Sequence, residues 1–296
     1  MKNGNFLSVL FVVTLVFLVM ARGGDHQGDL PEIVDEVRET SLPFVITDQP
    51  AMASVIAAFD ASAPVVLAKY LWKEESLAEK NINQRWAMAS LTKLMSAVVA
   101  KENLNPDGAI IIDKESWAAD GTAGGFLPGE NFLVSDLIKA MLVVSSNDAA
   151  EALARSYGQK EFVSMMRRKA EQLGMFDTYY ADTTGLSSLN QSTAADLEKL
   201  VRYIYSQYPE FFEISREREV EITELKSKIK RKLVNINKFT AEDYFIGGKT
   251  GFTEEAGGNL ISLFRHQNQP LLIMIFGAED RFAETQKVYD WINLIR

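Results

Sequence analysis

The sequence predicts an α+β fold in which an antiparallel sheet is flanked by helices and an all-helical lobe is inserted between its strands. Runs typical of strands lie at 55–59 and 65–71, and again at 259–264 and 271–278. The long section between them has apolar residues at helical spacing. Because every strand must bury an apolar face, strands from both ends of the folded part are expected to share one sheet. No internal repeat divides the chain.

Composition narrows the class of protein. Of the 296 residues, 47% are hydrophobic and 24% charged, which is typical of a globular domain. The net charge of −9 is unfavourable for nucleic acid, so no such partner is expected. There is no cysteine, and the two histidines, His26 and His266, lie in a polar tail and in a turn-like run. We therefore expect no disulfide, no histidine-based triad, no metal and no cofactor.

The first 50 residues are expected to precede the folded domain. An apolar run at 6–21 follows Lys2 and is shorter than most membrane spans, so 1–21 is typical of a secretion signal, with an uncleaved N-terminal anchor as the alternative. Residues 22–50 are acidic and polar and predict a flexible linker. The domain at 51–296 is then exported, to a periplasmic or other extracytoplasmic location. Since the chain ends at Arg296, any membrane attachment is expected through 6–21.

The helical section begins near Ser90. Apolar side chains at Leu91, Leu94, Met95 and Val98 form one stripe of a helix that faces the core. Asn-Pro-Asp-Gly at 105–108 ends this helix, because proline and glycine are the residues of turns.

Four more helices are expected along the chain. One covers 134–144, and Asp148 is expected to cap the next, which runs through Tyr157. An amphipathic helix at 162–173 ends at Gly174. The next helix is expected to be capped by Ser192.

The remainder of the chain has short strands and turns. The basic run 226–232 predicts a solvated hairpin rather than a site for an anionic polymer. The apolar runs at 259–264 and 271–278 predict paired core strands, and a final helix is expected at 281–295.

Ser90 and Lys93 form the first motif with chemical meaning. Their spacing places them one helical turn apart near a helix N-terminus. A serine is a poor nucleophile until a base takes its proton, and a desolvated lysine can be that base. The helix N-terminus favours a developing oxyanion. A capping serine beside a surface lysine would give the same pattern, which recurs at Ser227 and Lys230, so the motif alone is weak.

Two further motifs follow in order, Ser145-Ser-Asn147 and Lys249-Thr-Gly251. With them the sequence resembles the penicillin-binding DD-peptidases, most closely the low-molecular-mass D-alanyl-D-alanine carboxypeptidases, over nearly all of 52–296. The resemblance also includes Ala89-Ser-Leu-Thr-Lys93, Ser145-Ser-Asn-Asp-Ala149, Leu173-Gly-Met175, Gly185-Leu186, Ser192-Thr-Ala194 and Gly248-Lys-Thr-Gly-Phe-Thr-Glu-Glu-Ala-Gly257.

This resemblance implies a β-lactamase/DD-peptidase-like fold and an activity. The enzyme would be a carboxypeptidase or DD-endopeptidase acting on peptidoglycan stem peptides that end in D-Ala-D-Ala, with β-lactams as covalent inhibitors. Ser90 would attack the carbonyl, and Lys93 would be its base, held neutral by burial and by the positive charge of Lys249. Ser145 would relay a proton to the departing D-alanine.

Binding roles follow from the same resemblance. Asn147 would hydrogen-bond the substrate backbone, and the N–H groups of Ser90 and Phe252 would form the oxyanion hole. The residues that would meet substrate, including its terminal carboxylate, are Asn147, Lys249, Thr250, Gly251, Phe252 and Arg281.

Three alternatives remain to be weighed. A class A β-lactamase adds a glutamate that activates water, but the local counterpart, Leu186-Ser-Ser-Leu-Asn190, has leucine in its place. A phosphate-binding loop ending at Gly248-Lys-Thr250 would need a glycine where Asp243 stands, and is discarded. A non-catalytic penicillin- or peptidoglycan-binding module would normally lack part of the Ser90 motif or Lys249, which this chain retains.

Overall fold

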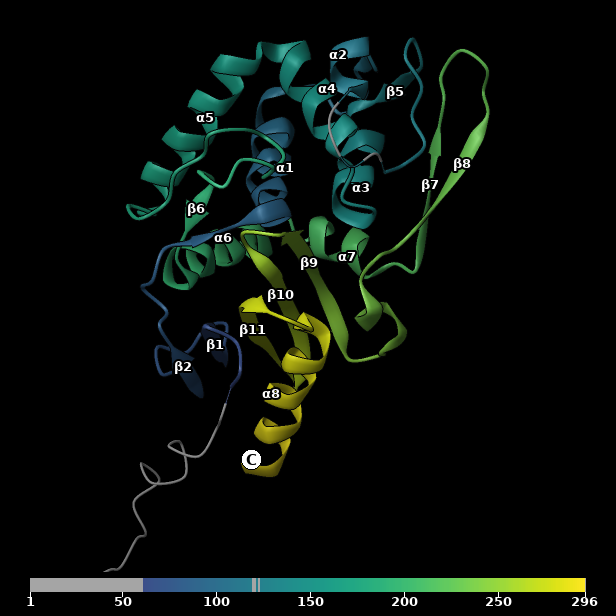
Figure 1. Ribbon diagram of the computed structural model, residues 1–296. Coiled ribbons are helices and arrows are strands. Elements are labelled where there is room, and N and C mark those ends of the chain that lie inside the picture. The colour runs from purple at the N-terminus through teal and green to yellow at the C-terminus, as the bar shows by residue number, and fades with distance from the viewer. Residues whose placement is uncertain (1–60, 119–120, 122, 296) are drawn as a thin grey trace, which may run out of the picture. The chain divides into compact units, whose positions relative to one another are not determined.

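The central sheet joins sequence-distant parts of the chain. A computed structural model describes residues 61–118, 121 and 123–295 (Figure 1). The strand expected at 55–59 and the predictions for 1–50 lie outside these residues. Five antiparallel strands pair in the order β2-β1-β11-β10-β9. Their bounds are β1 Val65–Tyr70, β2 Ala78–Lys80, β9 Phe245–Thr253, β10 Gly257–His266 and β11 Gln269–Ala278.

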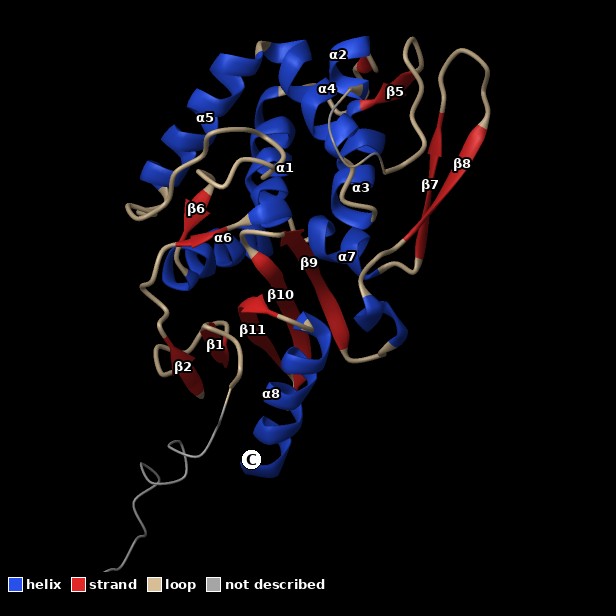
Figure 2. Cartoon of the chain, in the orientation of Figure 1, coloured by secondary structure: helices blue, strands red, loops and turns tan. Residues whose placement is uncertain are grey.

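The sheet is buried on both faces. Along β11, Leu272 and Met274 face one hydrophobic cluster, whereas Ile273 and Ile275 face another. A strand covered on both sides reads as a continuous apolar run rather than an alternating one. Helix α8, Arg281–Ile295, packs on one face, and the helical lobe packs on the other (Figure 2). The predicted α+β fold, with the lobe inserted between strands of one sheet, is confirmed.

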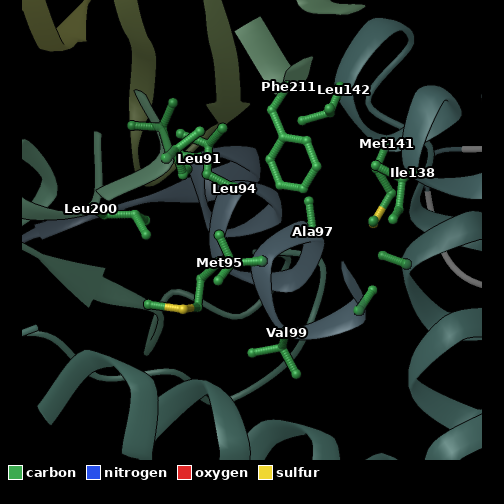
Figure 3. Close-up of a cluster of buried hydrophobic side chains, with 14 of the residues drawn as sticks. Leu91, Leu94, Met95, Ala97, Val99, Ile138, Met141, Leu142, Leu200 and Phe211 are labelled. Carbon is green, nitrogen blue, oxygen red and sulfur yellow. The ribbon is translucent and has the colours of Figure 1, made fainter. Parts of the chain in front are cut away.

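Helix α1, Thr92–Asn103, lies at the centre of the lobe and follows directly from the 3-10 turn η3, Ala89–Leu91. Every residue from Thr92 to Ala100 is buried, because three helices pack around α1: α3 Val134–Val143, α4 Asn147–Tyr157 and α5 Gln159–Gln172. Figure 3 shows its side chains meeting Ile138, Met141 and Leu142 of α3, Leu200 of α6 and Phe211 of α7. The single apolar stripe expected from the sequence is therefore only part of the buried surface.

Besides the central sheet, η3, α1 and α8, the described residues form seven helices or helical turns and six short strands. The helices are α2 Lys114–Trp117, α3 Val134–Val143, α4 Asn147–Tyr157, α5 Gln159–Gln172, α6 Ala194–Gln207, α7 Glu210–Arg216 and the 3-10 turn η4 Lys238–Ala241. The strands are β3 Trp86–Ala87, β4 Ala109–Ile111, β5 Asn131–Leu133, β6 Gln191–Ser192, β7 Glu219–Thr223 and β8 Lys230–Val234.

Four details of the sequence prediction were wrong. Ser146, not Asp148, caps α4 and accepts from the N–H of Ala149 at 3.2 Å. Thr193, not Ser192, caps α6, because a cap is the last residue outside the helix and Ser192 still pairs in β6. The lobe also holds the strand pairs β3-β6 and β4-β5, so it is not all-helical. His266 ends β10, where it is buried against Tyr70.

Candidate active site

Ser90 stands on a turn that the sheet holds in place. Ala89, just before it, has a φ of 48°, a value that residues other than glycine rarely adopt. The amide of Asn259 on β10 donates to the carbonyls of Ala87 at 2.8 Å and Met88 at 3.2 Å. Its oxygen accepts from the N–H of Gly277 at 3.0 Å. The turn is therefore tied to two strands by one buried side chain.

Gly251 brings the third motif against the first. It lies opposite Asn259 in the β9-β10 register. A methyl group at this position would come within 2.9 Å of the Met88 carbonyl and 3.2 Å of the Ser90 nitrogen. Only glycine lets β9 approach the Ser90 turn so closely, because its backbone needs no room for a side chain.

The Lys93 amine meets three oxygens. It lies 3.0 Å from Ser90 Oγ, and it donates to Asn147 Oδ1 at 2.6 Å and to the carbonyl of Thr184 at 2.7 Å. A neutral amine has two hydrogens and one lone pair. Because the two acceptors take the hydrogens, the lone pair faces the Ser90 hydroxyl. This arrangement suits removal of the serine proton.

Burial makes the neutral form of Lys93 accessible. The side chain is fully buried, and this desolvation lowers its pKa to about 7. The negative charges of Asp182 and Glu151 have the smaller, opposite effect and raise the pKa. Lysine ordinarily titrates near 10.4, so burial gives this amine a base fraction at neutral pH that a surface lysine lacks.

The second motif lies between α3 and α4. Ser145 has a φ of 59° and is half-buried. Its hydroxyl is directed toward β9, where it accepts a hydrogen bond from Lys249. Asn147 begins α4 and is buried; its Nδ2 reaches the carbonyl of Gly121 at 3.5 Å. The break between the helices thus places a hydroxyl beside Lys249 and an amide beside Lys93.

Lys249 links the third motif to the second. Its amine donates to Ser145 Oγ and to the carbonyl of Thr250, both at 2.8 Å. Desolvation, followed by the charges of Lys93 and Arg281, lowers its pKa well below the usual value. In the free protein, burial and the neighbouring positive charges therefore disfavour the charged form of Lys249 that we expected from the sequence. An arriving carboxylate would favour that charge.

Arg281 is the first residue of α8 and lies beside Gly258 on β10. Its Nε is buried without a hydrogen-bond partner, and its guanidinium lies 5.1 Å from the Phe282 ring. Among the described residues, neither Arg281 nor Lys249 forms an ion pair. These two basic side chains, next to buried Thr250 and to Phe252, which is 60% exposed, suit an anionic ligand.

Residues 181–190 form a loop whose contacts with the site the sequence analysis did not foresee. Asp182 Oδ1 accepts from the N–H groups of Thr184 at 2.8 Å and Gly185 at 2.6 Å, which turns the Thr184 carbonyl toward Lys93. The Gly185-Leu186 pair was the one available signal. Leu186 of this loop is 44% exposed.

We expect Gly185→Ala to damage both the fold and the site. Gly185 has a φ of 88°, and a methyl group there would lie 1.8 Å from the Ala89 carbonyl oxygen. Displacing the Ser90 turn should lower the free energy of unfolding by about 3 kcal/mol and slow acylation. Gly129 has a φ of 89° with nothing within 4 Å, so Gly129→Ala is the matched control for backbone strain alone. Thermal unfolding and penicillin labelling of both variants check this; equal effects would contradict it.

The second Ser-x-x-Lys sequence forms no such site. Ser227 Oγ donates to Glu224 at 2.7 Å, whereas Lys230 pairs with Glu221 at 2.7 Å. Both lie on the solvated β7-β8 hairpin, as the basic run predicted. Among the described residues no cluster of histidine, aspartate and glutamate could hold a metal ion, and no described helix has the length and apolarity to cross a membrane.

Known proteins are similar to this chain in sequence and in fold. A family model for D-alanyl-D-alanine carboxypeptidases, peptidase family S11, matches residues 62–280. The D-alanyl-D-alanine endopeptidase of Haemophilus influenzae is 38% identical over 188 residues, which cover 61% of this chain and 63% of that protein. The D-alanyl-D-alanine carboxypeptidase DacC of Escherichia coli is 30% identical over 232 residues, covering 73% of this chain and 57% of DacC. This chain thus matches less than two thirds of the length of either relative.

The fold of this chain is also similar to that of a solved structure. The D-alanyl-D-alanine carboxypeptidase of Mycobacterium tuberculosis H37Rv superposes with a TM-score of 0.74 at 26% identity, over 80% of this chain and 93% of that one. With a family match across most of its length, the chain belongs to the D-alanyl-D-alanine carboxypeptidase family, S11.

Proposed function

We propose that the protein is a serine-type D-alanyl-D-alanine carboxypeptidase or DD-endopeptidase that cleaves peptidoglycan stem peptides through an acyl-enzyme on Ser90. The observation that supports this most directly is the Lys93 amine, which is buried and lies 3.0 Å from Ser90 Oγ, with Asn147 and Thr184 accepting its hydrogens. Relatives named as carboxypeptidases and as endopeptidases both match the chain, so the proposal includes both reactions.

In the acylation step, Ser90 Oγ attacks the carbonyl carbon of the penultimate D-alanine, and its proton passes to Lys93 Nζ. The N–H groups of Ser90 and Phe252 receive the oxyanion. Ser145, which accepts a hydrogen bond from Lys249, passes its proton to the leaving amine as the peptide bond breaks and receives in return the proton that Lys93 took from Ser90. Water then attacks the ester and gives a proton to neutral Lys93, which passes it to Ser90 Oγ as the ester bond breaks.

Substrate binding in the proposal uses the basic side chains of Lys249 and Arg281. The substrate carboxylate would meet Lys249, Thr250 and Arg281, while Asn147 and the Gly251-Phe252 backbone would hold the peptide. Since β-lactams present a carboxylate and a strained amide in the same relation, they are expected to acylate Ser90. Without a glutamate in the 186–190 segment, the resulting ester should hydrolyse slowly, which disfavours a β-lactamase.

Location forms a further part of the proposal. The substrate is part of the cell wall, so the enzyme would act outside the cytoplasm. Export would depend on residues 1–21, either as a cleaved signal or as an anchor.

Incubation with fluorescent penicillin and with two peptides tests the proposed function. We expect a stable covalent adduct, and release of D-alanine from a pentapeptide or cleavage of a cross-linked dimer. Which peptide reacts distinguishes carboxypeptidase from endopeptidase. Rapid turnover of penicillin would instead indicate a β-lactamase, and a folded protein that forms no adduct would indicate a binding module.

A further inference from the structure

We propose that two acids, Asp182 behind Thr184 and Glu151 behind Thr183, stabilise the ammonium ion formed when Lys93 takes the proton of Ser90. Both are positioning residues, because neither touches Ser90. Asp182 acts through Thr184, which accepts from Lys93, and Glu151 acts through its charge from behind the neighbouring Thr183. The inference rests on the proposed function, because it deepens the role of Lys93 as general base.

Asp182 acts through Thr184. The Lys93 amine donates to the Thr184 carbonyl at 2.7 Å, and Thr184 in turn donates its N–H at 2.8 Å and its hydroxyl at 3.1 Å to Asp182 Oδ1. A residue whose N–H meets a carboxylate has a more strongly accepting carbonyl, since hydrogen bonds in a chain polarise one another. Asp182 Oδ2 also accepts from the Ser187 N–H at 2.7 Å, which fixes the loop.

Glu151 approaches from the other side, on α4. It lies one helical turn after Asn147, so both side chains lie on the same side of α4. Glu151 Oε1 accepts from the Thr183 hydroxyl at 2.8 Å, and Oε2 accepts from Gln159 at 2.6 Å. Thus α4 supplies one direct acceptor for Lys93 and one carboxylate behind the neighbouring threonine.

The charges around Lys93 come from three elements. Asp182 on the loop and Glu151 on α4 raise the Lys93 pKa, against the larger effect of burial. Lys249 on β9 is the positive charge coupled to Lys93 from the sheet side. Burial and, to a smaller extent, the charge of Asp182 raise the Glu151 pKa, whereas the Thr183 hydroxyl and the charges of Arg155, also on α4, and Lys93 favour its ionised form.

The acylation reaction changes the balance of charges around Lys93. When Ser90 Oγ bonds to the substrate carbonyl and its proton moves to Lys93, a new positive charge forms beside the buried amine of Lys249. Among the described residues, Asp182 and Glu151 are the acids whose negative charges raise the Lys93 pKa and so favour the ammonium ion. Losing one of them should weaken the base and lower its pKa.

Glu151→Gln is the sharper probe, because the amide oxygen can still accept from Thr183 while the charge is lost. Asp182→Asn would also remove an acceptor from the loop backbone. Acylation requires neutral Lys93, so its rate rises as pH increases through the Lys93 pKa. In Glu151→Gln we expect this acidic limb to move to lower pH by about half a unit or more. The plateau rate should fall about three- to tenfold.

Glu102→Gln is the matched control. Glu102 lies on α1, pairs with Lys169 at 2.7 Å and accepts from Tyr203, and has no place in the site. Its variant can lose stability but should keep the acidic limb where it is. Thr183→Val serves if Glu151→Gln does not fold. It removes a hydrogen bond that favours ionised Glu151, so a smaller shift in the same direction is expected.

The measurement is the penicillin acylation rate from pH 5 to 9, with circular dichroism at each pH. A limb that stays in place or moves to higher pH in a folded Glu151→Gln or Thr183→Val protein overturns the inference. That result leaves the proposed function intact, provided that the unmodified protein acylates. A protein that never acylates defeats the proposed function itself.

Discussion

Ser90→Ala should abolish covalent labelling by penicillin while leaving the protein folded. Removing the hydroxyl eliminates the only atom of this residue that can form the ester. The backbone turn at Ala89 and Ser90 is held by Asn259 and packed against Gly251, and these contacts do not involve the hydroxyl. We therefore expect adduct formation to fall below detection, with a thermal midpoint close to that of the unmodified protein.

Mass spectrometry of the intact protein measures this result directly, and peptide mapping locates the adduct. Ser227→Ala provides the control, since Ser227 belongs to the second Ser-x-x-Lys sequence yet bonds Glu224. It should label normally. A folded Ser90→Ala protein that still carries the adduct, on Ser227 or elsewhere, would defeat the assignment of the nucleophile.

Lys93→Met should stop acylation by peptides and β-lactams alike, because no proton acceptor remains beside Ser90. Loss of a positioned general base typically lowers the rate by about 10²–10⁴-fold. Methionine keeps much of the buried volume, so the variant should fold. The expected result is a depressed saturating rate, whatever the ligand concentration.

Lys249→Arg provides the comparison that separates the two lysines. Arginine keeps the charge but replaces a compact ammonium, bonded to Ser145 and to the Thr250 carbonyl, with a wide planar group. We expect weaker capture of the substrate carboxylate and a smaller loss of the saturating rate. Acylation rate against the concentration of a carboxylate-bearing β-lactam distinguishes the two effects. If Lys249→Arg lowers the saturating rate as far as Lys93→Met, Lys249 belongs to the proton-transfer machinery, which its hydrogen bond to Ser145 would then explain.

Local pattern predicted most of the architecture. The strands β10 and β11 and the helix α8 were found because each is a continuous apolar or amphipathic run. The three motifs were found because nucleophile, base and carboxylate receptor need particular residue types. The structure brings Ser90, Lys93 and Asn147 into one hydrogen-bonded group and Ser145 and Lys249 into a second.

What the sequence did not reveal depends on contacts between distant residues. Asn259 reaches across more than 170 positions to hold the Ser90 turn, and no local pattern in its strand marks that role. Asp182 reads as an ordinary loop residue until its bonds to the Thr184 and Gly185 backbone are seen. The caps of α4 and α6 were displaced by one or two positions, because neighbouring residues had equally suitable side chains.

The burial of Lys93 links catalysis to the pH dependence of folding. In the unfolded chain this amine would titrate near its ordinary value, whereas in the folded protein its pKa is about 7. The unfolded state therefore binds the proton more tightly, and between these two values the free energy of unfolding rises with pH. Below pH 7 the folded state bears the whole penalty, on the order of 5 kcal/mol. Lys249 adds to it in the same direction. Acidification therefore weakens the fold between these two values, and it silences the base only as the pH falls through about 7. The loss of stability from this group should come before the loss of activity.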